Sequence, residues 1–121
     1  MIKITSRNFS VEKIIEKTKS SQTGAVVCFL GTVRNDKIKS MRIECYKEMA
    51  KKELRKLEQE AERRFDIHKI SIIHRIGKLK VSDNIVLIAV GAEHRAEAFK
   101  ACKWLIDELK KVVPIWKEEI K

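Results

Sequence analysis

The sequence predicts an α+β sandwich in which two or three helices cover a mostly antiparallel sheet. Two observations carry this prediction. Segments with helical spacing of apolar residues alternate along the chain with segments of strand-like alternation. The chain has 121 residues, 44% of them hydrophobic, which is enough for one core but not for two. We therefore expect residues 1–121 to form a single domain.

The first elements are a short strand, a short helix and a strongly apolar strand. Ile2 and Ile4 alternate with polar neighbours, as in a strand, and Ser10 is a helix N-cap for an amphipathic segment ending near residue 19. The run over residues 24–33 begins with a glycine and is rich in β-forming residues. It predicts a central strand buried on both faces.

The middle of the chain predicts three strands and a long helix. Residues 41–46 alternate and indicate a half-exposed strand, whereas residues 48–65 have apolar residues at helical spacing. Two further strands are expected over residues 69–76 and 84–90. Glycine, serine and aspartate mark the segment between them, residues 77–83, as a loop.

The last helix is expected over residues 95–112, and the only proline, Pro114, follows it. Proline disfavours the helical conformation of the preceding residue and has no backbone N–H, so the chain should turn near Val113. Lys110 and Lys117 then lie on either side of a fixed bend. Two amines held close together repel, which lowers the pKa of at least one and makes it a candidate proton donor or nucleophile. On an open tail the same lysines are only solvated.

Composition limits the classes of partner. Lys and Arg total 27 against 17 Asp and Glu, and the net charge of +10 predicts attraction to nucleic acid, a phosphorylated metabolite or an acidic protein. No apolar run approaches the roughly 20 residues that cross a bilayer, and the N-terminus lacks a secretion leader, so we expect a cytoplasmic protein. Cys28, Cys45 and Cys102 lack disulfide or zinc spacing and are interpreted as small buried hydrophobes.

Two groups of basic residues stand where strands end. Arg34 follows the expected central strand and has the geometry to bind phosphate or carboxylate, although spacing alone favours an ordinary surface arginine. His94 and Arg95 open the last helix, where unpaired N–H groups and the helix dipole favour an anion. A structural pair between Arg95 and Glu93 or Glu97 is an equally good interpretation.

Motifs for other chemistries are missing. The sequence has no metal-ligand cluster, glycine-rich phosphate loop or Ser-His-Asp pattern, so we expect no metal and no cofactor. His74 is interpreted as a structural residue packed at a sheet edge. The remaining candidates would form a pocket for a phosphorylated anion if the fold brings them together: Arg34, His94, Arg95, Lys110 and Lys117.

Four segments carry a family resemblance. They are GAVV through GTVRN at 24–35, IHRIG at 73–77, EHRAEAF at 93–99 and PIWK at 114–117. In this order and spacing they closely resemble the large, catalytic subunit family of molybdopterin synthase, over nearly the whole chain. The expected α+β sandwich is then α/β-hammerhead-like.

The resemblance implies a sulfur transferase that converts cyclic pyranopterin monophosphate to molybdopterin. The sulfur is carried as a thiocarboxylate on the C-terminal Gly-Gly of a small ubiquitin-like subunit, whose tail enters the large subunit's pocket. Two large subunits typically form a homodimer at the centre of a heterotetramer. Neither a membrane nor a nucleic acid is an expected partner.

The resemblance also implies roles for individual residues. Lys117 is expected closest to the thiocarboxylate carbonyl and Lys110 closest to the pterin, with an ammonium supplying a proton and stabilising developing negative charge. The anion-binding, His-Arg and pocket-lining aromatic positions of the family fall on Arg34, on His94 and Arg95, and on Phe29.

The chain departs from the family pattern at three places. The connection over residues 35–40 is shorter than usual, the chain stops at Lys121 where members usually continue into a basic and aromatic tail, and Ile106 stands where methionine is usual. Two other functions stay open. One is a non-catalytic scaffold for the ubiquitin-like subunit, and the other is a basic nucleic-acid-binding module, which the low aromatic content of 6% disfavours.

Overall fold

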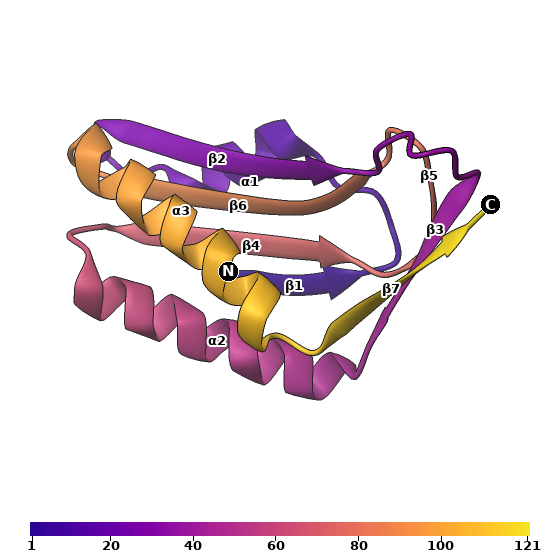
Figure 1. The fold of residues 1–121 in the computed structure, drawn as a ribbon. Helices are drawn as coiled ribbons and strands as arrows, with labels where there is room; N and C mark the ends of the chain where they lie inside the picture. The colour runs from indigo at the N-terminus through magenta and orange to yellow at the C-terminus, as the bar shows by residue number, and fades with distance from the viewer.

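A four-stranded sheet forms the centre of the structure, a computed structural model that describes residues 1–121 (Figure 1). Its strand order is β1 (Ile2–Thr5), β4 (Lys69–Arg75), β6 (Asn84–Ala92) and β2 (Ala25–Thr32). Only β1 and β4 are parallel, and the other neighbours are antiparallel. The expected α+β class with a mostly antiparallel sheet is confirmed.

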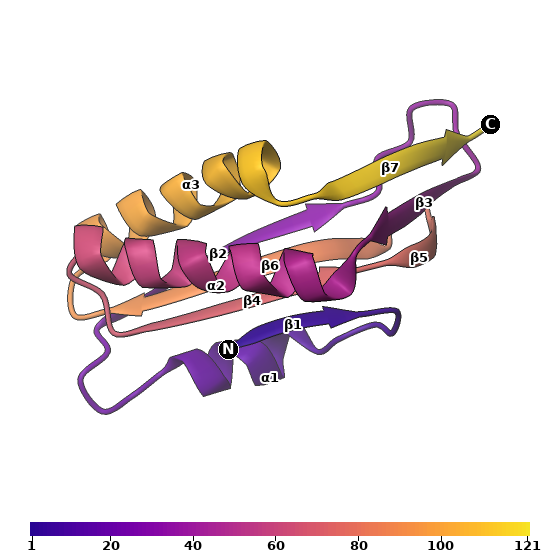
Figure 2. The same cartoon turned by 90° about the horizontal axis from the view of Figure 1, so that it is seen from below.

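Three helices cover the two faces of this sheet. The short helix α1 (Val11–Thr18) lies on one face, and α2 (Lys47–Arg64) and α3 (Arg95–Val112) lie side by side on the other (Figure 2). The Ser10 cap is formed as expected, because its hydroxyl accepts a hydrogen bond from the backbone N–H of Lys13.

A second, three-stranded sheet stands at one end of the molecule (Figure 1). Its central strand β3 (Ser40–Cys45) pairs antiparallel with β5 (Gly77–Lys80) and β7 (Ile115–Ile120). The loop expected over residues 77–83 therefore begins with a strand, and the chain beyond Pro114 is a strand that the sequence did not indicate. Both are short and only half apolar, so their partner β3 decides their conformation.

The expectation that residues 24–33 form a central strand buried on both faces is wrong. The strand β2 lies at the edge of the main sheet, and its residues Cys28, Leu30 and Thr32 are exposed. The interior strands are β4 and β6, of which β6 has an equally apolar sequence. The cysteines differ likewise from expectation, since only Cys102 is buried, while Cys28 is exposed and Cys45 is half-buried.

One core joins both sheets and the two long helices. Its 22 buried residues include Ile43 and Leu79 from the small sheet, Leu54 from α2 and Leu105 from α3. A smaller cluster of four residues lies beneath α1. Because protein cores are close-packed, this shared core holds the small sheet at a defined distance from the end of α3.

Candidate functional site

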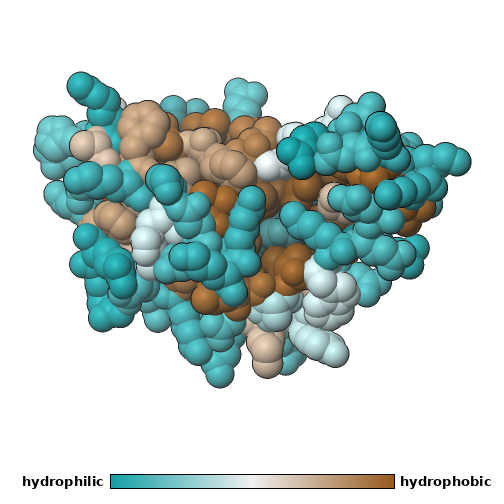
Figure 3. All heavy atoms as spheres, in the orientation of Figure 1, coloured by the Kyte–Doolittle hydropathy of each residue, from teal (hydrophilic) through white to brown (hydrophobic).

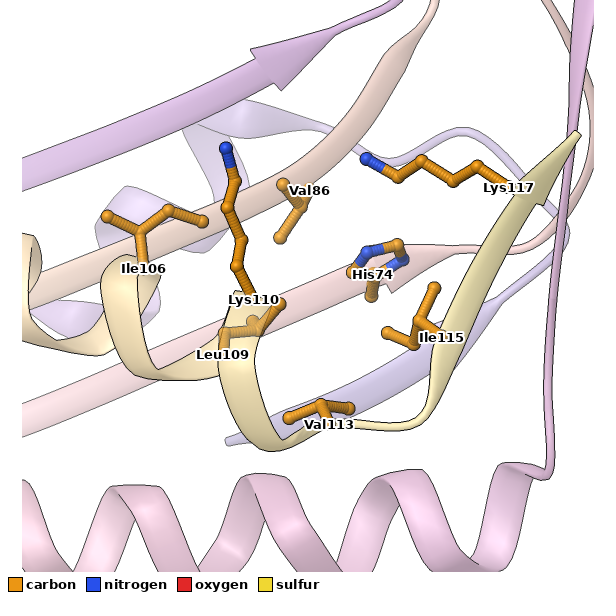
Figure 4. A pocket seen from close by; sticks show the side chains of 8 residues that line it. All are labelled: His74, Val86, Ile106, Leu109, Lys110, Val113, Ile115 and Lys117. Atoms are coloured by element: carbon orange, nitrogen blue, oxygen red, sulfur yellow. The ribbon is translucent and has the colours of Figure 1, made fainter. Parts of the chain in front are cut away.

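The chain turns sharply at the end of α3, as the proline predicts. The N–H of Val113 still donates to the carbonyl of Leu109, at 3.1 Å, and then the N–H of Ile115 donates to the carbonyl of Val113, at 2.8 Å. Val113 is buried and anchors the turn. The bend places Lys110, in the last turn of α3, opposite Lys117 on β7 (Figure 4).

A cavity of about 300 Å³ lies between these two lysines. The end of α3, the start of β7 and the interior strands β4 and β6 form its walls (Figure 4). Figure 3 shows hydrophobic residues gathered in the middle of this face and hydrophilic residues around them. The lining consists of five apolar residues, two amines and one imidazole: Val86, Ile106, Leu109, Val113, Ile115, Lys110, Lys117 and His74.

The amine of Lys117 is electrostatically perturbed. Lys117 pairs with Ile43 across the small sheet, and alternation along the strand turns it to the same face as Ile115, toward the cavity. Its pKa is lowered, first because part of the side chain is removed from water and second because the Lys110 ammonium is near. A lysine in this state releases its proton more readily than a solvated one.

His74 lies within this cavity wall and not at a sheet edge, which corrects the sequence interpretation. Its strand β4 is interior, and the residue is only 2% exposed. Its Nδ1 atom is 2.8 Å from the carbonyl oxygen of Arg75. Burial, and then the charge of Lys117, lowers the pKa of His74 to about 4, against the opposing effect of that hydrogen bond. The sequence signal that could have identified His74 is its place directly after the isoleucines of a buried strand.

Two of the expected substrate-binding residues, Phe29 and Arg34, do not line the cavity. Phe29 is half-buried on β2, and its ring and the side chain of Val86 converge on the same point above Gly31. Arg34 leaves the end of β2 with its side chain 84% exposed, and its guanidinium pairs with Asp36, at 2.9 Å. Arg34 therefore lies on the exposed connection after β2, held by Asp36.

His94 and Arg95 lie at the other end of α3, in an open hollow with Gly24 and Ala25. The helix rise places this end roughly 22 Å from Lys110. The structural pairing considered for Arg95 is not formed, because Glu93 lies 3.6 Å from His94 and Glu97 pairs with Lys100. A single copy of the chain therefore brings Lys110 and Lys117 together at one cavity, but it leaves His94 and Arg95 at the opposite end of α3.

No group of three or more His, Cys, Asp and Glu side chains is arranged to hold a metal ion. None of the three helices combines the length and apolar composition needed to span a bilayer.

Comparisons with known proteins agree on one family. The family model described as MoaE protein matches residues 4–112. A molybdopterin synthase catalytic subunit of Pyrococcus abyssi is 46% identical, covering 93% of this chain and 79% of the relative. One of Thermoplasma volcanium is 37% identical, covering 98% and 90% of the two chains.

Solved structures have the same fold. The crystal structure of molybdopterin synthase from Staphylococcus aureus superposes with a TM-score of 0.93 at 38% identity, covering 97% of this chain and 88% of that one. A complex of subunits 1 and 2 of a molybdopterin-converting factor from Helicobacter pylori has a TM-score of 0.84 at 21% identity. At that identity it shows the fold alone.

Proposed function

The chain belongs to the MoaE protein family, and we propose that, as the catalytic subunit of a molybdopterin synthase, it transfers sulfur to cyclic pyranopterin monophosphate. The sulfur comes from the C-terminal thiocarboxylate of a small ubiquitin-like subunit. The observation that carries this proposal is the pair of amines, Lys110 and Lys117, facing each other in an apolar cavity. Its volume of about 300 Å³ is at the small end for a ligand site.

The amines suit the demands of the reaction. When the thiocarboxylate sulfur attacks the substrate, negative charge develops and the departing oxygen needs a proton. An ammonium in a partly desolvated site stabilises that charge and supplies the proton. Lys117, on the strand after the bend, acts at the thiocarboxylate carbonyl, and Lys110 acts at the pterin.

The lowered pKa of Lys117 also predicts a side reaction. The neutral amine of Lys117 is a nucleophile, so it attacks the thiocarboxylate carbon when substrate is absent, forming an amide with the partner's tail and releasing sulfide. The product would be a covalent adduct of the two subunits.

The separation of the basic residues supports a homodimer. At one end, β2 adjoins the hollow of His94 and Arg95, and at the other its residue Gly31 pairs with Val86 of the cavity. The outer edge of β2 has no neighbouring strand, and the strand exposes Leu30. A second copy packed antiparallel along β2 would set its His-Arg pair beside the first copy's lysines, and two-fold symmetry would complete both sites.

The net charge of +10 supports an acidic partner. We expect a heterotetramer of two copies of this chain and two small subunits, with each tail entering one lysine cavity. In this assembly Arg34, together with His94 and Arg95 of the second copy, binds the phosphate and the pterin.

Reconstitution tests the proposal. The protein is mixed with a thiocarboxylated small subunit and cyclic pyranopterin monophosphate, and the product is followed by mass spectrometry. We expect a product that has gained two sulfurs, and none when the partner ends in an ordinary carboxylate. Binding of the small subunit without any product would instead support a non-catalytic scaffold.

A further inference from the structure

The lysine cavity contains two amines and a single side chain able to accept a hydrogen bond. Of its eight lining residues, five are apolar, and Lys110 and Lys117 are donors when charged. No carboxylate lines it. The remaining residue is His74, whose ring lies among the side chains of Lys110, Lys117 and Ile115 (Figure 4).

The ring of His74 has a defined tautomer. A carbonyl oxygen only accepts hydrogen bonds, so Nδ1 must carry the proton that it shares with the carbonyl of Arg75, 2.8 Å away. In the neutral ring Nε2 is then an unprotonated acceptor, whereas the hydrogen bond of the ring to the Arg75 carbonyl is made by Nδ1. Because the residue is 98% buried, this acceptor is available only to groups inside the cavity.

We propose that His74 is a positioning residue for sulfur transfer, whose Nε2 accepts a hydrogen bond from the ammonium of Lys117 and holds that amine in the cavity. The proposal rests on the proposed function only for the identity of the reaction. Lys117 has a flexible stem and three donors, so its amine can rotate to the imidazole edge. Without this hydrogen bond, repulsion from the Lys110 ammonium would move the Lys117 amine out of the cavity into bulk water.

No charged side chain in the cavity lining competes with His74 as an acceptor for the Lys117 amine. From α3 the only titratable group facing it is Lys110, and β6 contributes only Val86. On β7, Glu119 shares a strand face with Lys117 by alternation, but it does not line the cavity. Burial and the nearby cation keep the pKa of His74 low, at about 4, so the ring stays a neutral acceptor at physiological pH.

Two conservative substitutions separate the two nitrogen atoms. His74→Asn places an amide N–H near the position of Nδ1 and keeps the bond to the Arg75 carbonyl, but it lacks an acceptor at the Nε2 position. His74→Gln places its amide at the Nε2 position and loses the inner donor. A purely structural histidine predicts that Asn is the better replacement, whereas a positioning histidine predicts that Gln is.

The experiment measures single-turnover sulfur transfer in the reconstituted synthase from pH 6 to pH 10, together with the titration of lysine side-chain signals by NMR in the protein alone. For His74→Asn we expect the single-turnover rate to fall about tenfold or more, with the half-saturating substrate concentration unchanged. A loss of this size corresponds to one hydrogen bond to a charged group. His74→Gln should stay within about threefold of the parent.

The titration gives a readout independent of turnover. Loss of an acceptor for the charged form lowers an amine's pKa, so His74→Asn should move the titration of Lys117 to lower pH, and His74→Gln should restore it. An unchanged rate and titration in His74→Asn, or an equal loss in both variants, would overturn the proposal. If the parent protein transfers no sulfur, the proposed function fails, and the titration still decides the role of His74.

Discussion

The two ends of α3 carry similar basic residues in opposite environments. At the C-terminal end, Lys110 faces Lys117 across an apolar cavity, and burial lowers the pKa of Lys117. At the N-terminal end, His94 and Arg95 stand in an open hollow, and the side chain of His94 is 79% exposed. Charge alone does not distinguish these ends. Lys110 and Lys117 keep contact with water, so the two ends differ in the partial desolvation of Lys117 and in its nearness to Lys110.

The largest effect on the rate of sulfur transfer is expected from removing the amine of Lys117. Lys117→Ala should reduce sulfur transfer by roughly 10²- to 10⁴-fold if Lys117 supplies the proton as proposed. The matched control is Lys111→Ala, since Lys111 is exposed, one residue from Lys110 and 3.8 Å from Glu108. Product formation is measured by mass spectrometry, with circular dichroism confirming the fold. Equal activity of the two variants would contradict the catalytic assignment.

The open end should be tested for action in trans. Arg95→Ala and Lys117→Ala are each expected to be nearly inactive alone. If the second copy supplies Arg95, mixing the two variants under exchange conditions should restore about a quarter of the parental activity, because half of the dimers are mixed and each has one intact site. An absence of recovery, with subunit exchange shown by native mass spectrometry, would place Arg95 outside the lysine site.

Acid should destabilise the protein through the buried end. The pKa of His74 is about 4 in the folded chain and 6.5 in its ordinary state, so between these values the unfolded chain binds more protons. Stability therefore rises with pH in this window, and acidification from pH 6.5 to 4 should cost about 3 kcal/mol from this group. Urea unfolding at both pH values measures the loss.

A comparison of variants assigns that acid dependence. His74→Asn should lose less free energy of unfolding between pH 6.5 and pH 4 than the parent, since the buried titrating group is gone. His94→Asn removes a histidine from the open end and controls for general effects. An undiminished dependence in His74→Asn would mean that other groups dominate acid unfolding.

The smallest change in stability is expected from substitution of Arg34. Arg34 is exposed and pairs only with Asp36, so Arg34→Ala should alter the free energy of unfolding by less than about 0.5 kcal/mol. If Arg34 binds the substrate phosphate, the same substitution should raise KM about tenfold. Asp36→Ala, which frees the arginine, should not raise KM. A raised KM in both variants would indicate a role for the loop itself.

Sequence reasoning succeeded where the cause was local. Helical spacing, the Ser10 cap and the stop at Pro114 each depend on neighbouring residues, and the structure has them. It failed where the cause was a distant strand. The strands β5 and β7 exist because β3 offers both of its edges, and β2 is an edge strand although its apolar run resembles that of β6.

The site divides in the same way. The sequence determined that Lys110 and Lys117 lie across a bend, because a proline fixes the backbone over a few residues. Only the tertiary structure decided that His74 joins them and that His94 and Arg95 do not. Those outcomes follow from strand order and from the length of α3, which a local pattern does not contain. The partial desolvation of Lys117 and its nearness to the Lys110 ammonium, which together lower its pKa, are likewise properties of the packed chain.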